Sequence, residues 1–124
     1  MKLLLDTHAA LWWLSDDARF GEAAARQLTD PTNQVLLSAA VVWEVGIKRS
    51  LGKLEAPRDL APTLLEAGAL ALPVDLDHAA AVEALPWHHR DPFDRLLVAQ
   101  AHVEDAALVS GDAVLDAYGV RRVW

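Results

Sequence analysis

Short apolar runs alternate with longer segments of helical periodicity along the chain. The apolar runs predict strands at residues 2–5, 35–38, 70–72, 107–109 and 121–123. The longer segments predict helices at residues 7–14, 21–29, 39–50, 60–67, 76–84 and 92–104. Strands that are apolar on both faces and alternate with helices are typical of an α/β fold, in which helices cover both faces of a parallel sheet.

Size and composition fit one domain spanning residues 1–124. A chain of 124 residues, 53% of them hydrophobic, can bury a substantial core. It has no cysteine, which excludes disulfides and thiolate metal sites. Asp6 and His8 interrupt the apolar N-terminus, and no run approaches the roughly 18 apolar residues of a membrane span. We therefore expect a soluble, cytoplasmic protein that does not enter a membrane.

Two acidic residues follow predicted strands. Asp6 comes directly after the first strand, and Asp112 lies just beyond the fourth. The carboxyl ends of parallel strands meet at one edge of a sheet, where α/β proteins bind their ligands. Each acid also has a local alternative. Asp6 could cap the next helix, unless Thr7 does so, and Asp112 could be a turn residue.

Glu44 interrupts an apolar helix face. On its predicted helix it shares a face with Ala40, Ile47 and Leu51. A buried carboxylate is costly unless it is paired or binds a metal, so this position indicates a functional acid. The alternative is a surface ion pair with Lys48, four residues further on, which explains the charge but not the apolar face.

Asp94 shows the same pattern on the last long helix. It shares a face with Leu97, Val98 and Ala101. An acid in the first turn is also favoured by the helix dipole alone, so a local role explains Asp94 equally well. Asp91 is different, because helix capping accounts for it fully, and we do not expect it to bind metal.

These acids offer only oxygen ligands, which suit a hard cation such as Mg²⁺ or Mn²⁺. The candidate catalytic and metal-binding residues are Asp6, Glu44, Asp94 and Asp112. A net charge of −7 argues against a protein that coats nucleic acid, but it is compatible with a nuclease whose acidic pocket binds metal, and with a basic partner segment. The histidines, including the adjacent His88 and His89, show no zinc pattern, and we expect them to be structural or exposed.

Three further polar residues are candidates for accessory roles beside the acids: Thr7, Ser110 and Asp116. Asp116 lies four residues beyond Asp112 and would share its face if that segment is helical, where it could help to bind a second metal. The commoner outcome for such a residue is a solvated surface acid.

Four segments of the sequence resemble motifs of PIN-domain proteins of the VapC toxin type. They occur in the family's order at residues 5–14 (LDTHAALWWL), 43–48 (WEVGIK), 89–101 (HRDPFDRLLVAQA) and 108–112 (LVSGD). The third segment is the most specific of the four. Ser110 stands where the family often has threonine, and the hydroxyl is retained.

The resemblance implies a PIN-like three-layer α/β/α sandwich with a central parallel sheet of about five strands. It implies an Mg²⁺- or Mn²⁺-dependent endoribonuclease that leaves a 5′-phosphate and a 3′-hydroxyl. It also implies the toxin of a type II toxin–antitoxin system, neutralised by a cognate VapB-like antitoxin whose tail covers the active site, and a homodimer. Asp94 thereby becomes a stronger candidate ligand.

An RNA substrate would also need contacts outside the acids. Arg90 and Arg95 are candidates for contact with RNA phosphate. For Arg95, a surface helix position without any contact to RNA is an equal alternative. We expect Trp12 and Trp13 to lie in the core or at a dimer surface rather than to stack on RNA bases.

Other classes of protein fit the sequence less well. A haloacid-dehalogenase-type phosphatase also places an aspartate after its first strand, but it needs a second one two residues on, where this chain has His8. A phospho-acceptor receiver domain needs a late lysine, and the last lysine here is Lys53. A non-catalytic PIN-like binding module is the remaining alternative, against which the presence of all four acids argues.

Overall fold

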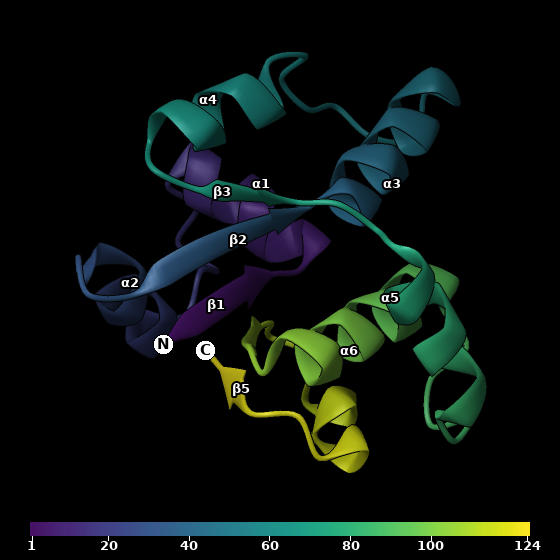
Figure 1. The fold of residues 1–124 in the computed structure, drawn as a ribbon. Helices are drawn as coiled ribbons and strands as arrows, with labels where there is room; N and C mark the ends of the chain where they lie inside the picture. The colour runs from purple at the N-terminus through teal and green to yellow at the C-terminus, as the bar shows by residue number, and fades with distance from the viewer.

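Five strands form one parallel sheet in the computed structural model, which describes residues 1–124 (Figure 1). They are β1 (Lys2–Leu5), β2 (Gln34–Ser38), β3 (Leu70–Leu72), β4 (Ala107–Val109) and β5 (Arg122–Val123). Their order is β3-β2-β1-β4-β5, and every neighbouring pair is parallel. The prediction of an α/β fold with a five-stranded parallel sheet is confirmed.

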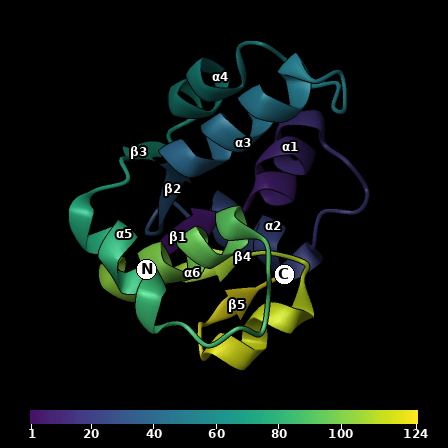
Figure 2. The ribbon, with the colours of Figure 1, turned by 90° about the vertical axis from the view of Figure 1, so that its right-hand side faces the viewer.

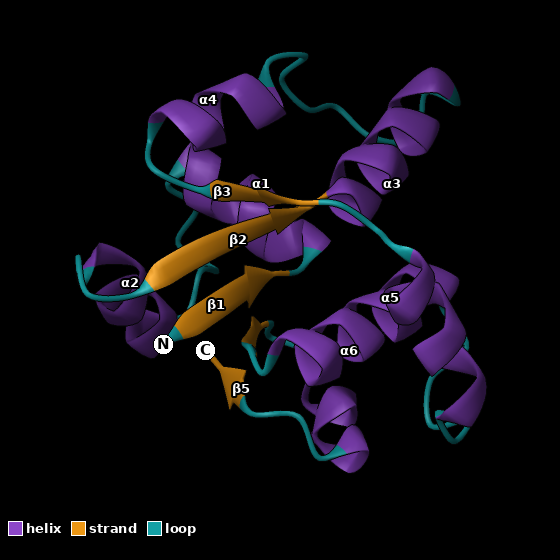
Figure 3. Ribbon diagram, in the orientation of Figure 1, coloured by secondary structure: helices purple, strands orange, loops and turns teal.

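Helices cover both faces of this sheet (Figures 2 and 3). They are α1 (Thr7–Ser15), α2 (Glu22–Thr29), α3 (Ala39–Ser50), α4 (Leu60–Glu66), α5 (Leu76–Ala81) and α6 (Pro92–Glu104). Helix α1 contacts α3 and α4 in one layer, whereas α5 packs on α6 in the other. The layers meet where Trp43 of α3 lies edge-on to Phe93 of α6, with ring centroids 5.1 Å apart. None of these helices combines the length and apolarity needed to cross a membrane.

Two 3₁₀ helices depart from the predicted elements. The predicted helix at residues 76–84 ends as an α-helix at Ala81, and η1 (Val82–Ala84) tightens its last turn ahead of Pro86. The second, η2 (Ala113–Tyr118), was not predicted, because it is short and has no clear apolar period. Asp112 caps η2, and Gly119 ends it with a φ of 74°.

The strand order changes direction beside β1. From β1 the chain builds outward through β2 and β3, and it then returns to add β4 and β5 on the opposite side. The carboxyl ends of β1 and β4 are adjacent, since Leu5 pairs with Val109. Ligands of open α/β sheets bind at such a switch point. Asp6 directly follows Leu5, so this edge is where a site is expected.

A buried polar network fixes α6 against the sheet. The Ser38 hydroxyl at the end of β2 donates to Gln100 Oε1 over 2.6 Å, and Gln100 Nε2 donates to the Pro73 carbonyl over 3.3 Å. His78 is fully buried and lies 2.8 Å from Glu104 Oε2 through Nε2. Gln100 and Glu104 both belong to α6. The network therefore ties the helix that carries Asp94 to β2 and to the segment after β3.

Candidate metal centre

Asp6 lies at the switch point with its side chain only 7% exposed. Its Oδ1 accepts a 2.8 Å hydrogen bond from the Ala9 N–H, so Asp6 itself caps α1. The expectation that Thr7 caps this helix was wrong, because Thr7 is already the first helical residue. The Ser110 side chain also hydrogen-bonds the Asp6 carboxylate. Burial raises the pKa of Asp6, against the lowering effect of the Ser110 side chain and the Ala9 amide.

Glu44 is buried on α3, as its place in an apolar face predicted, with 5% of its surface exposed. Both of its oxygens have partners. The Thr7 hydroxyl donates to Oε1, and Lys48 Nζ lies 2.9 Å from Oε2. Glu44 is therefore buried and also forms the ion pair with Lys48 that was proposed as the alternative. Thr7, an accessory candidate, holds Glu44 in place.

Asp91 and Asp94 divide the roles at the start of α6. Asp91 Oδ1 accepts from the amides of Phe93 and Asp94, at 2.8 and 3.0 Å, which confirms Asp91 as the helix cap. The Asp94 carboxylate lies 3.4 Å from His89 Nε2 through its Oδ2. Burial raises the pKa of Asp94 to about 7, the negative charge of Asp91 adds to this, His89 opposes it, and Asp6 and Glu44 contribute further. Asp94 is thus a partly buried carboxylate among other carboxylates.

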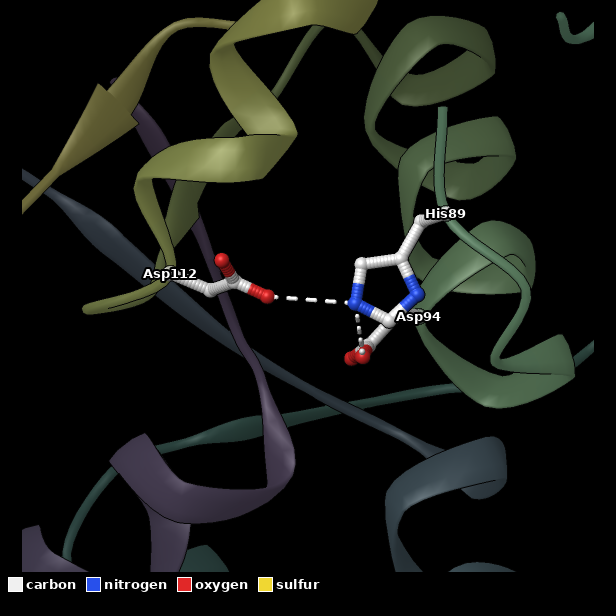
Figure 4. A group of neighbouring side chains, drawn as sticks. All are labelled: His89, Asp94 and Asp112. Carbon is white, nitrogen blue, oxygen red and sulfur yellow. Dashed lines mark hydrogen bonds and ion pairs between the residues drawn. The ribbon is translucent and has the colours of Figure 1, made fainter. Parts of the chain in front are cut away.

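His89 completes a cluster with Asp94 and Asp112 (Figure 4). Its Nε2 lies 3.2 Å from Asp112 Oδ2 and 3.4 Å from Asp94 Oδ2. Its Nδ1 accepts the Asp91 N–H over 3.0 Å, so the hydrogen of a neutral ring belongs on Nε2. In this arrangement His89 donates to the acids and has no lone pair to offer a metal.

The sequence interpretation missed His89, which it placed among the structural or exposed histidines. The signal available was its position two residues before the capping Asp91. A ring nitrogen at that spacing can accept the amide of residue i+2 and so fold the ring back over the helix start. The other member of the pair, His88, instead packs against Tyr118, with ring centroids 5.1 Å apart.

Two of the remaining site candidates lie elsewhere. Asp116 pairs with Arg122 on the surface, at 2.8 Å, which is the surface position expected from the sequence as the commoner outcome. Arg95 is only 3% exposed, which rules out the surface position that contact with RNA phosphate requires. Its guanidinium donates to the Pro86 carbonyl over 2.8 Å and thereby supports the loop that carries His89.

Ser110 and Arg90 have the positions expected of them. The fully buried Ser110 accepts the Asp112 amide over 3.1 Å and also lies beside Asp6. Its hydroxyl therefore connects the two acids at the strand ends. Arg90 is exposed. Its contact with RNA stays a prediction.

The donor set suits a hard divalent cation. Asp6, Asp94 and Asp112 offer carboxylate oxygens at one edge of the sheet, where Asp94 and Asp112 lie in one cluster and Asp6 and Asp112 line one pocket. Burial, with a contribution from neighbouring acids, raises the pKa values of Asp6 and Asp94, and a bound cation would favour their charged forms. Oxygen ligands of this kind favour Mg²⁺ or Mn²⁺ over softer metals. The fold and these residues define a doubly wound α/β protein with a candidate carboxylate metal centre at its switch point.

Comparison with known proteins identifies the family. The model of the PIN domain matches residues 3–120, and the chain therefore belongs to the PIN domain family. A sequence search of curated proteins finds no significant match.

Solved structures share the fold at low sequence identity. VapBC2 from Rickettsia felis, bound to a promoter DNA fragment, matches with a TM-score of 0.73 and 13% identity, over 98% of this chain and 97% of the other. DNA-bound VapBC from Salmonella typhimurium matches with a TM-score of 0.71 and 15% identity, over 98% and 96%. A toxin–antitoxin complex from Klebsiella pneumoniae matches with a TM-score of 0.55 and 17% identity, over 89% and 86%.

Proposed function

We propose that this protein is an Mg²⁺- or Mn²⁺-dependent endoribonuclease and the VapC-type toxin of a type II toxin–antitoxin system. PIN domains are generally nucleases that use divalent metals. The observation that carries the proposal is the convergence of Asp6, Glu44, Asp94 and Asp112 at the switch point of a PIN domain, where burial and neighbouring acids raise the pKa of Asp94 to about 7. A surface built only to bind a partner does not need this costly arrangement of buried acids.

In the proposed reaction, a water oxygen attacks phosphorus and the bond from phosphorus to the 3′ oxygen breaks. One water proton ends on that 3′ oxygen, so the products are a 5′-phosphate and a 3′-hydroxyl. A bound divalent ion would acidify the water and offset phosphate charge. Asp6, Asp94 and Asp112 are the residues that would hold it.

The remaining residues position these ligands. Glu44 is held by Thr7 and Lys48, so it is placed to act through a water molecule rather than by direct coordination. Ser110 keeps the loop of Asp112 beside Asp6. His89 supplies a hydrogen-bond donor between Asp94 and Asp112. A cation bound by both acids would displace this donor at least partly.

We further propose a VapB-like antitoxin as partner, together with a homodimer. The similar structures include VapBC proteins and a toxin–antitoxin complex, which supports the first of these. The net charge of −7 suits a basic antitoxin segment. An almost wholly apolar groove of about 640 Å³ between α3, α4 and β3, lined by residues that include Val42, Trp43 and Leu65, suits the apolar side of such a segment. Light scattering of the protein alone and with a candidate VapB-like antitoxin tests both proposals.

Cleavage of RNA tests the proposed function. The purified protein should cut RNA with Mg²⁺ or Mn²⁺ and stop when EDTA is added. Asp6→Asn and Asp94→Asn should each lower the rate roughly a hundredfold or more, because each removes a proposed ligand. Asp116→Asn is the matched control, since this acid pairs with Arg122 on the surface. Full activity in folded Asp94→Asn, or cleavage that persists in EDTA, would contradict the proposal.

A further inference from the structure

A pocket of about 520 Å³ opens beside the acids, between α1, the loop after β4 and the chain after β5. Asp6 and Asp112 line one part of it. The rest is lined by flat or cationic side chains, which are His8, Trp12, Arg19 and Trp124. The pocket therefore connects the acids of the candidate metal centre to a surface of aromatic and basic side chains.

Three planar groups pack around Trp12. The His8 ring stacks on the Trp12 indole at 5.1 Å with an interplanar angle of 12°. The Arg19 guanidinium carbon lies 4.6 Å from the Trp12 ring centroid. The Trp124 ring is tilted by 55° at 5.8 Å. Trp13, the neighbour of Trp12 in the sequence, instead packs with Phe20 at 5.2 Å. The structure thus separates the two tryptophans, and only Trp12 lines the acidic pocket.

This surface is built into the fold. Trp124 lies so close to Gly111 that a Cβ there would come within 2.9 Å of its ring, so the indole rests directly on the loop that carries Asp112. Asp17 holds Arg19 through Nε and Nη2, at 3.0 and 2.8 Å. No protein group engages Arg19 Nη1, which is free to donate to an anion.

We propose that this pocket binds one unstacked base of single-stranded RNA, next to the phosphodiester that the acids address. The inference rests on the proposed function and adds a base-binding pocket to that site. Aromatic and guanidinium planes stack on bases of any sequence, whereas a base in a duplex has both faces covered. Arg19 Nη1 also offers a hydrogen-bond donor to an RNA phosphate.

Binding and cleavage can be measured separately to test this. Binding is followed by fluorescence anisotropy with a labelled twelve-nucleotide single-stranded RNA, in an Asp94→Asn background that should not cut it. Adding Trp12→Leu should weaken binding about 5-fold or more, because it removes a wall of the pocket and the ring on which His8 and Arg19 pack. Adding Trp12→Phe should preserve most of the affinity, and Trp13→Leu is the matched control. The same RNA in a duplex should bind more weakly than the single strand.

Thermal unfolding first confirms that each variant folds. Equal binding by the Trp12→Leu and Trp13→Leu proteins, or duplex binding as tight as single-strand binding, would overturn the pocket proposal. Cleavage by the unsubstituted protein is measured in parallel. If it cuts RNA while binding is independent of Trp12, the pocket proposal alone fails. If binding depends on Trp12 but no RNA is cut, the proposed function alone fails.

Discussion

Replacing Asp94 with asparagine should stabilise the metal-free protein at pH 8, although it removes a proposed metal ligand. Burial raises the pKa of Asp94 to about 7, assisted by the charge of Asp91. Between about pH 4 and 7 the folded protein retains a proton that the unfolded chain releases, so stability falls as the pH rises through this range. Above about pH 7 the folded protein carries the full cost of the buried charge, and asparagine removes that cost.

The magnitude follows from the same pKa. A rise from 3.8 to about 7 sets a ceiling of about 4 kcal/mol on the cost of ionised Asp94 at pH 8. Because 25% of the side chain is exposed, solvent screening reduces this, and we expect a gain of about 1–2 kcal/mol in the free energy of unfolding. For a chain of this length the melting temperature should rise by about 3–8 °C. The gain should shrink toward acidic pH.

Thermal unfolding followed by circular dichroism measures this gain, with EDTA or MnCl₂ at pH 8 and pH 5. Excess Mn²⁺ should stabilise the unsubstituted protein, by about 2.7 kcal/mol at a hundred times the dissociation constant, and should stabilise Asp94→Asn by about half of this or less. Asp105→Asn is the control, because Asp105 is exposed and its φ of 53° suits asparagine. If Asp94→Asn melts below the unsubstituted protein in EDTA at pH 8, the reasoning from buried charge is refuted.

Two further substitutions test the supports of the site. Arg95→Met should lower the free energy of unfolding by about 2–4 kcal/mol, because it leaves the Leu85 and Pro86 carbonyls without the guanidinium that donates to them. Urea unfolding measures this, and a change below about 0.5 kcal/mol would contradict the role given to Arg95. Gly111→Ala should lower the free energy of unfolding by about 1–3 kcal/mol, because its Cβ would meet the ring of Trp124. The displaced indole should also change the tryptophan fluorescence spectrum. An unchanged spectrum and melting temperature would show that the indole does not rest on this loop.

The fold could be read from the sequence because its strands are apolar on both faces and its helices have clear caps. The run Leu3, Leu4 and Leu5 is fully buried, as a central parallel strand requires. The start of α6 was also predicted from Asp91 and Pro92, because proline is favoured at the first position of a helix. The 3₁₀ helix η2 could not be predicted, because its cap and its terminal glycine also occur in simple turns.

The candidate site was predictable where a charge breaks a local rule. Glu44 stood out because it interrupts an apolar face, and the structure confirms that it is buried, whereas its catalytic role stays a prediction. Partners brought together by tertiary structure were not predictable. Nothing local shows that Arg95 turns inward to backbone carbonyls, or that His89 bridges Asp94 and Asp112. These contacts depend on how the loop before α6 folds back on the sheet edge.

The metal centre itself is tested most directly by calorimetric titration of Mn²⁺ into the purified protein at pH 8, without RNA. The unsubstituted protein should show saturable binding. Asp6→Asn and Asp94→Asn should each abolish it or weaken it at least about tenfold, whereas Asp116→Asn should bind as the unsubstituted protein does. Absence of binding in the unsubstituted protein, or equal binding in all three variants, would contradict the assignment of a metal centre to these acids.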